Sequence, residues 1–369
     1  MSKNAHRSTR LVFGFMTGTS LDGLDGAAVR IEGRGLDMRC ALETSVSLPL
    51  DACEPILRAL AEGRALMGAE IAAGALGLGE LHAEAVRRLI DQSGPPDLVA
   101  LHGQTVFHSP PLSWQLVNPW PVAKAAGCPV VHDFRGSDLA AGGQGAPITP
   151  IADWILFRSK EKSRAVVNLG GYCNITMLPA GAGPEDIRAF DVCACNQLLD
   201  AVARRALDTP YDASGARAGA GEAHTGALDD LLKLLDAQRR SGRSLGTGDE
   251  SGGWIDAWID RLGPEDLAAT AARGVGETIA RAAAGADETI VAGGGARNLA
   301  LVGAIGESVR TTDDIADIPV NLREAACMAV LGALCADGVP ITLPNVTGAA
   351  PPAPIAGAWA GLDRSKTNA

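Results

Sequence analysis

Two aspartates and a group of hydroxyl side chains follow an apolar segment near the N-terminus, a combination that could bind phosphate and a metal ion. Residues 11–16 form an apolar run, the next four residues read Thr-Gly-Thr-Ser, and Asp22 and Asp25 follow before a second apolar run at residues 27–31. This order of strand, polar turn and strand predicts a β-hairpin. Backbone N–H groups and hydroxyls in such a turn can hydrogen bond phosphate oxygens, and an aspartate can hold magnesium beside them.

The phosphate ligands expected from this hairpin are Gly18, Thr19, Ser20, Asp22 and Gly23. Glycine allows a ligand to approach the backbone closely. An ordinary hairpin turn contains the same residue types, so these residues alone favour the two interpretations equally. A Walker-type loop needs Gly-Lys-Ser/Thr, and no lysine lies near this turn. Phosphate binding here would therefore follow the hairpin route of the actin and hexokinase superfamily.

A second segment has the same layout. Two strand-like runs, residues 164–169 and 172–177, flank Gly170 and Gly171. With Asn168 beside it, this turn could contact phosphate as the first one would, although a simple hairpin turn explains it equally well. Two hairpins of this kind, one at the start of each half, indicate an internally duplicated fold.

A glycine-rich segment at residues 293–298 follows a predicted strand at residues 288–292. Glycines between a strand and a helical segment allow a base or a phosphate to lie against the backbone. The candidate nucleotide ligands of this segment are Gly293, Gly294, Gly295 and Asn298. A dinucleotide-binding site is the weaker match, because the segment lacks the Gly-x-Gly-x-x-Gly spacing of such sites.

Polar side chains also follow two short predicted strands, where ligands of α/β proteins bind. Residues 97–101 lead into His102, Gln104 and Thr105, and another strand-to-loop junction ends at Arg135. Arg135 could hold a carboxylate through two hydrogen bonds, which would suit an acidic substrate. The histidines of these segments have no spacing typical of a metal site.

Asp191 ends a short predicted strand at residues 189–192, ahead of a predicted helix at 196–207. A carboxylate at a strand end can act as a general base and take a proton from water or a hydroxyl. An aspartate that caps the following helix is the more common arrangement. The sequence thus makes Asp191 a candidate base without excluding a structural role.

The composition limits the classes of protein to which the chain can belong. Its 369 residues are enough for roughly two domains, and 47% are apolar. A formal net charge of −11 argues against nucleic-acid or anionic-membrane partners. No run of about 18 uncharged apolar residues and no signal-peptide cleavage site is present, so we expect no membrane span and no signal peptide. The eight cysteines show no zinc or disulfide spacing, so we expect a reducing, cytoplasmic location. Neither a Gly-x-Ser-x-Gly elbow nor the protein-kinase motifs occur.

In order along the chain, these segments resemble the motifs of the anhydro-N-acetylmuramic acid kinase family. The first hairpin, with Met-Thr-Gly-Thr-Ser-Leu-Asp-Gly-Leu-Asp, is similar to the family's M-S-G-T-S-x-D-G-x-D signature. The further matching segments are residues 102–108, 133–135, 140–147, 168–171, 174–176, 293–298 and 323–325. Together they span about residues 11 to 348.

The resemblance implies an α/β fold of two domains, actin/hexokinase-like (a duplicated ribonuclease H-like fold), with a cleft between them. We expect residues 1–134 plus 338–369 to form the N-terminal domain and residues 135–337 the C-terminal domain. The family's activity would be ATP-dependent phosphorylation of the sugar O6, coupled to hydrolytic opening of the 1,6-anhydro bridge. The product would be N-acetylmuramic acid 6-phosphate, an intermediate of peptidoglycan recycling.

The resemblance also assigns roles to residues. Asp191 would be the base that activates water, ATP and Mg2+ would be required, and a homodimer is possible. The sugar ligands would be His102, Gln104, Thr105 and Arg135, and the candidate metal ligands Asp22, Asp25 and Glu324.

One motif departs from the family pattern. Where the family has D-T-G-P-G-N, this chain reads Asp-Val-Cys-Ala-Cys-Asn from Asp191 to Asn196. If the family glycines require positive φ, Cys193 and Cys195 would change the path of the loop. Two alternatives therefore stay open: a kinase of another anhydrosugar or hexose, such as levoglucosan, and a non-catalytic sugar or nucleotide sensor.

Overall fold

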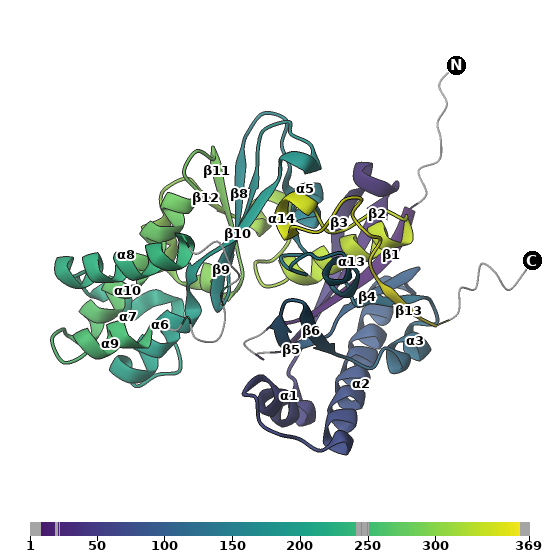
Figure 1. The fold of residues 1–369 in the computed structure, drawn as a ribbon, viewed down its shortest axis with the longest axis horizontal. Coiled ribbons are helices and arrows are strands. Elements are labelled where there is room, and N and C mark those ends of the chain that lie inside the picture. The colour runs from purple at the N-terminus through teal and green to yellow at the C-terminus, as the bar shows by residue number, and fades with distance from the viewer. Residues whose placement is uncertain are drawn as a thin grey trace, which may run out of the picture. The chain divides into compact units, whose positions relative to one another are not determined.

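The computed structural model describes residues 9–18, 21, 23–240, 245, 249 and 251–361. The chain forms two compact units. The first comprises the described residues of Met1–Leu156, Ala316–Ile318 and Leu322–Ala369, and the second comprises those of Phe157–Ile315 and Pro319–Asn321 (Figure 1). No helix among the described residues has the length and apolar character needed to cross a membrane.

The first unit is built on a six-stranded sheet in the order β13-β7-β4-β1-β2-β3. Its strands are β1 (Thr9–Thr17), β2 (Leu24–Glu32), β3 (Arg39–Leu48), β4 (Leu98–His102), β7 (Val130–His132) and β13 (Ala358–Ala360). Strands β1, β2 and β3 are antiparallel neighbours, whereas β4 runs parallel to β1 and β7 parallel to β4. A separate hairpin pairs β5 (Gln104–Ser109) with β6 (Leu112–Leu116).

Alternation of side chains along β1 lets helices cover both faces of this sheet. Leu11, Phe13 and Phe15 belong to one apolar cluster with residues of α2 (Gly68–Ser93). The opposite face receives α13 (Arg323–Ala336), and a Cβ atom on Gly14 would overlap the backbone of that helix. The unit also contains α1 (Glu54–Ala61), α3 (Trp120–Ala126), α4 (Gly136–Ala140), α5 (Pro150–Phe157) and α14 (Pro344–Thr347), with 3-10 turns at Gly35–Asp37 and Asp51–Cys53.

The domain boundaries expected from the sequence differ from the two units in three places. Residues 135–156, 316–318 and 322–337 fall in the first unit, although they were expected in the C-terminal domain. The physical reason for the shift of residues 322–337 is the packing of α13 on β1, β2 and β4. Helix α13 is apolar on nearly all sides, so its sequence does not indicate which sheet it covers.

The second unit repeats the strand order of the first. Its sheet runs β10-β9-β8-β11-β12, made of β8 (Arg164–Leu169), β9 (Tyr172–Leu178), β10 (Arg188–Ala194), β11 (Glu288–Ala292) and β12 (Val309–Thr311). As in β3-β2-β1-β4-β7, the first three are antiparallel neighbours, and the last two continue the sheet in parallel. This shared order confirms the α/β fold of two ribonuclease H-like units that the sequence predicted.

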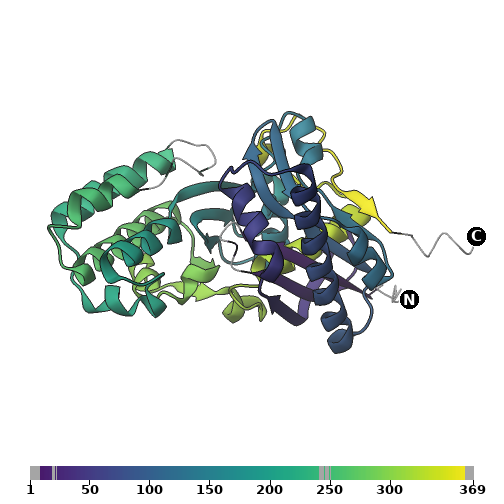
Figure 2. The same cartoon turned by 90° about the horizontal axis from the view of Figure 1, so that it is seen from below.

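Helices of the second unit gather around α10 (Pro264–Ala282), which contacts α6, α7, α8 and α11 (Figure 2). Pro264 and two acidic residues in the first turn favour this helix start. The other helices are α6 (Asn196–Val202), α7 (Ala216–Ala220), α8 (Thr225–Arg240), α9 (Gly252–Trp258), α11 (Leu299–Ile305) and α12 (Thr312–Ala316). Shorter turns of helix lie at Pro184–Asp186, Ala203–Leu207, Ala213–Gly215 and Gly294–Arg297.

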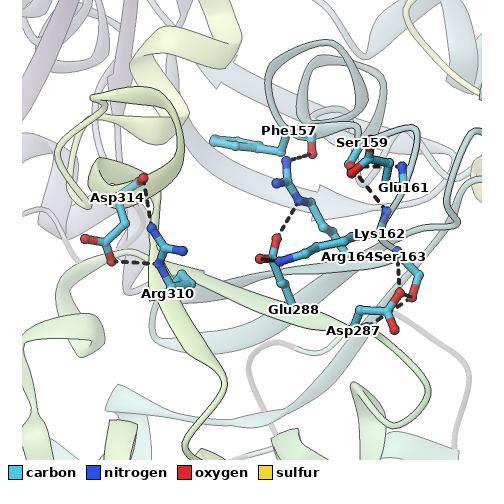
Figure 3. A network of polar contacts seen from close by, with 10 residues as sticks. All are labelled: Phe157, Ser159, Glu161, Lys162, Ser163, Arg164, Asp287, Glu288, Arg310 and Asp314. Carbon is cyan, nitrogen blue, oxygen red and sulfur yellow. Dashed lines mark hydrogen bonds and ion pairs between the residues drawn. The ribbon is translucent and has the colours of Figure 1, made fainter.

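A polar network holds the first residues of β8 and β11 together (Figure 3). Glu288 accepts hydrogen bonds from Lys162 Nζ at 2.5 Å and from Arg164 Nε at 3.0 Å. Asp287 accepts from the backbone and the hydroxyl of Ser163. Because β8 and β11 are parallel, this network fixes their amino ends, and the predicted nucleotide residues lie at their carboxyl ends.

Candidate active site

The predicted first hairpin is present. Met16 pairs with Asp25 and Thr17 with Leu24, and the Gly18 carbonyl accepts a hydrogen bond from Leu21 N at 3.2 Å. Three of the predicted ligands, Thr19, Ser20 and Asp22, lie outside the described residues. A Cβ atom on Gly23 would lie 2.8 Å from Leu48 O, so close packing on β3 already requires this glycine.

The parallel pairing of β1 and β4 brings two predicted groups to one edge of the first sheet. Met16 is opposite His102 in the register, so the start of the turn and the end of β4 are neighbours. His102 is buried, and its Nε2 accepts a hydrogen bond from Arg135 Nε at 3.2 Å. Burial lowers the pKa of His102 well below its ordinary value, and the charge of Arg135 lowers it further. His102 is therefore neutral near pH 7, with its proton on Nδ1.

Three buried polar atoms at this edge have no hydrogen-bond partner within the described part of the chain. They are Thr17 Oγ1, His102 Nδ1 and Gln104 Oε1. Buried polar groups nearly always have a partner, so unsatisfied ones call for an explanation. A polar ligand at the ends of β1 and β4 would satisfy them, since together they offer a hydroxyl, an N–H donor and a carbonyl acceptor.

Thr105 and Arg135 have protein partners in the structure. Thr105 Oγ1 accepts from Gln115 Nε2 at 3.5 Å, and Arg135 Nη1 donates to Gly145 O at 2.6 Å. Burial lowers the pKa of Arg135 to about 10, while the charge of Glu324 raises it. Arg135 thus joins His102 to the glycine-rich loop, and the predicted clamp on a substrate carboxylate stays a prediction.

Asp138 organises this loop, although sequence reasoning did not single it out. Asp138 is fully buried and accepts hydrogen bonds from Gly145 N and Thr347 Oγ1, each at 2.7 Å. The contact with Thr347 joins segments far apart in the sequence, so neither periodicity nor a local motif could indicate it.

Two candidate metal ligands lie in the first unit. The carboxylate of Asp25 accepts a hydrogen bond from Ser47 Oγ. Glu324 lies in the first turn of α13. Its pKa is raised, chiefly by burial and also by the charges of Asp153 and Asp25. The charges of Arg323 and Arg135 oppose this shift. No cluster of three or more His, Cys, Asp or Glu side chains suited to a metal occurs among the described residues.

The second hairpin is also present, and its turn contacts α6. Asn168 pairs with Asn174, while the carbonyls of Gly170 and Gly171 accept hydrogen bonds from the backbone at the start of α6. The Asn196 N to Gly170 O distance is 3.0 Å. These bonds satisfy N–H groups that a helix start leaves free, so the carbonyls of the turn have a structural role.

The glycine-rich segment packs against this hairpin. Gly293 has φ +84°, and a Cβ atom there would lie 2.8 Å from Leu169 O and 3.0 Å from Asn168 Oδ1. A Cβ atom on Gly295 would lie 2.9 Å from the side chain of Asn196. Asn298 is the N-cap of α11 and accepts from Leu301 N at 3.0 Å. The structure therefore brings Asn168, Gly293 and Gly295 together, whereas Asn298 Oδ1 caps a helix.

The sequence suggested that Asp191 ends its strand, but in the structure it lies within the strand. Strand β10 continues to Ala194, and its register shifts between Asp191 and Cys193. Such a bulge bends the strand and re-aims the side chains beside it. Asp191 is half-buried, opposite Asn174, and its Oδ2 accepts from Leu245 N at 2.8 Å.

The environment of Asp191 suits a base. Burial raises the pKa of its carboxyl, the Leu245 N–H lowers it, and the negative charge of Asp249 raises it again. The net shift is upward, towards the range in which a carboxylate accepts a proton more readily.

The cysteines of the altered motif have negative φ. Cys193 and Cys195 are fully buried in the core of the second unit, and Cys195 has φ −122° and ψ −101°, outside the main α and β regions. Neither residue needs the left-handed conformation that would favour glycine. The change of path that the sequence suggested therefore does not follow from positive φ in this chain.

Fold and site together define the class: a protein of two ribonuclease H-like units that carries paired glycine-containing hairpins and a base candidate on an edge strand. The family model for anhydro-N-acetylmuramic acid kinase matches residues 10–359. The anhydro-N-acetylmuramic acid kinase of Salinibacter ruber is 37% identical over 95% of this chain and 96% of its own length. That of Bordetella parapertussis is 40% identical over 93% and 94%. The chain belongs to the anhydro-N-acetylmuramic acid kinase family.

Several solved structures resemble the chain distantly. The activator of 2-hydroxyisocaproyl-CoA dehydratase from Clostridium difficile, with bound ADPNP, gives a TM-score of 0.44 at 12% identity, covering 88% of this chain and 94% of its own. The assignment of the fold rests on the strand order of the two sheets.

Proposed function

We propose that this protein is an ATP-dependent kinase that opens 1,6-anhydro-N-acetylmuramic acid by hydrolysis and phosphorylates O6. The product is N-acetylmuramic acid 6-phosphate, which places the enzyme in peptidoglycan recycling, in the cytoplasm. The observation that carries the proposal is the retained, half-buried Asp191 in a chain that matches the kinase family over almost its whole length.

Asp191 serves as the general base. Its carboxylate takes one proton from water, and the oxygen of that water forms a bond to C1 of the sugar. The bond between C1 and O6 breaks, and O6 then bonds to the γ-phosphorus of ATP while ADP leaves. The atoms balance as anhydrosugar, water and ATP giving sugar phosphate and ADP, and the proton on Asp191 passes to solvent.

Buried polar atoms of the first unit bind the sugar. Thr17 Oγ1, His102 Nδ1 and Gln104 Oε1 need partners, and sugar hydroxyls both donate and accept hydrogen bonds. Arg135 holds His102 in the tautomer that leaves Nδ1–H free to donate. Thr105 extends the same edge.

Glycine-containing backbone contacts the nucleotide in each unit. In the first, the turn that starts at Gly18 and includes Thr19, Ser20, Asp22 and Gly23 contacts phosphate. In the second, Asn168, Gly170, Gly171 and the segment Gly293, Gly294, Gly295 and Asn298 do so. The chain carries a net charge of −11, so its overall charge does not attract phosphate. Phosphate binding must then depend on local groups, and backbone N–H groups suit this role.

Asp25 and Glu324, with Asp22, would hold Mg2+. Carboxylate oxygens are the ligands that Mg2+ prefers, and a cation would relieve the repulsion that contributes to the raised pKa of Glu324. When bound, Mg2+ neutralises charge on the phosphate oxygens of ATP.

Mass spectrometry of the reaction product tests the proposal. With anhydro-N-acetylmuramic acid and ATP, the sugar should gain one phosphoryl group and one water. A product that gains the phosphoryl group alone would contradict the hydrolytic step, and an unchanged sugar would contradict the substrate. Levoglucosan, tested in parallel, distinguishes the kinase of another anhydrosugar.

A further inference from the structure

We infer that Gln238 is a positioning residue for Asp191, because its side-chain amide joins the bulged strand that carries this carboxylate to the backbone at Asp249. The inference rests on the proposed function, in which Asp191 is the base. Gln238 lies in the last turn of α8 and belongs to no motif of the sequence.

Two hydrogen bonds define the role of this side chain. Its Oε1 accepts from Ala194 N at 2.9 Å, and its Nε2 donates to Asp249 O at 2.7 Å. Strand β10 is the edge of its sheet, so Gln238, in place of another strand, provides the partner of this N–H group. The second bond fixes the backbone at Asp249, which is itself buried.

Both bonded positions lie next to the base. Ala194 follows the bulge at Asp191 and Cys193, where a strand bends most readily. Asp249 is four residues from Leu245, whose N–H donates to Asp191 Oδ2 at 2.8 Å. Gln238 thus restrains the strand that carries the base and the backbone at Asp249, whose charge acts on the same carboxylate.

Only a neutral amide can make this pair of bonds. Glutamate could accept from Ala194 N, but it would oppose the Asp249 carbonyl with a second acceptor and add negative charge near Asp191. Methionine has a similar length and can make neither bond well. The expected order of turnover is therefore glutamine, then glutamate, then methionine.

The first test compares Gln238→Met with the wild type. We expect kcat to fall by about ten- to a hundred-fold, because a small misplacement of a catalytic group costs up to about that factor. The affinity for ATP should stay unchanged. Lys233→Met, on an exposed position of the same helix, is the matched control and should keep wild-type kcat. Wild-type turnover in a folded Gln238→Met protein would overturn the inference; if that variant does not fold, Gln238→Glu decides in the same way.

A double-mutant cycle separates positioning from a general loss of structure. If Gln238 acts through Asp191, Gln238→Met should reduce kcat little or not at all in the Asp191→Asn protein. Equal fold-losses in both backgrounds would overturn the inference while leaving the base assigned. If Asp191→Asn alone keeps wild-type turnover, the assignment of the base fails, and the inference fails with it.

Discussion

At the scale of single residues, the account depends on a carboxylate whose surroundings favour proton uptake. Asp191 is half-buried on a bulged edge strand, and its carboxylate accepts a hydrogen bond from Leu245 N. The buried Cys193 and Cys195 beside it replace glycines of the family motif, and neither has a positive φ. The loop therefore does not depend on a positive φ at these two positions.

Asp191→Asn should lower kcat by at least about a hundred-fold, since general-base catalysis is typically worth ~10²–10⁴ in rate. Asparagine keeps the size of the side chain and can still accept from Leu245 N, but it cannot take the proton. The affinity for ATP, measured by calorimetry, should change little. Equal losses in ATP affinity and kcat would indicate a structural defect.

The pKa of Asp191 also predicts how kcat depends on pH. Burial raises the pKa of Asp191, and only the deprotonated form is active, so kcat should fall with decreasing pH through a value above the ordinary aspartate range. A pH–rate profile that stays flat down to the ordinary range would contradict the role of this group.

At the scale of elements, close packing and strand pairing hold the candidate sites in place. Helix α13 lies on β1 where Gly14 leaves room, and it carries Glu324 in its first turn. In the second unit, the network of Glu288 fixes the amino ends of β8 and β11, whose carboxyl ends carry Asn168 and Gly293.

Gly14→Ala should destabilise the protein by about 1–3 kcal/mol, because the added methyl group would overlap the backbone of α13 and force the helix away. Urea unfolding followed by circular dichroism measures the change. Gly68→Ala, in the first turn of α2 with open space around its Cβ position, should be neutral or slightly stabilising. A Gly14→Ala protein as stable as the control would show that α13 packs differently.

Glu288→Gln should cost about 1–3 kcal/mol of unfolding free energy near pH 7, because the largely buried Arg164 loses its charged partner. The pKa of Glu288 is lowered in the folded protein, chiefly by Lys162. Its stabilisation is therefore present above the pKa of the unfolded chain and is lost as the pH falls through the folded value. The difference from wild type should vanish in acid.

Glu265→Gln is the control for this substitution. Glu265 pairs with Arg217 in the same unit, but both side chains are more than a third exposed, so the loss of stability should be clearly smaller than at Glu288. Equal losses at the two positions would contradict the structural role of the Glu288 network.

At the scale of the whole molecule, two units share one strand order and each has its own apolar cluster. The sequence predicted this duplication from two hairpins, because local turn residues between apolar runs are sufficient to indicate each one. It misplaced residues 135–156, 316–318 and 322–337. For α13, which lies in the last of these segments, the sequence does not indicate the packing partner, because the helix is apolar on nearly all sides.

Some features of the candidate site could likewise be predicted from the sequence, and others could not. Glycine-rich turns and strand ends such as His102 could be predicted, because their residue types and positions are local features. The bulge at Asp191, the bonds of Gln238 and the bond between Asp138 and Thr347 could not, because each depends on pairing between separate segments of the chain. The expected cleft between the two domains stays a prediction.

Coupled ADP release tests the central claim most directly. The wild-type protein, with ATP and Mg2+, is offered anhydro-N-acetylmuramic acid, levoglucosan or N-acetylglucosamine. The account predicts fast ADP release with anhydro-N-acetylmuramic acid, and much slower release with the other two sugars. If the protein binds ATP but releases no ADP with any of the three sugars, the result would contradict the account and favour a non-catalytic sensor.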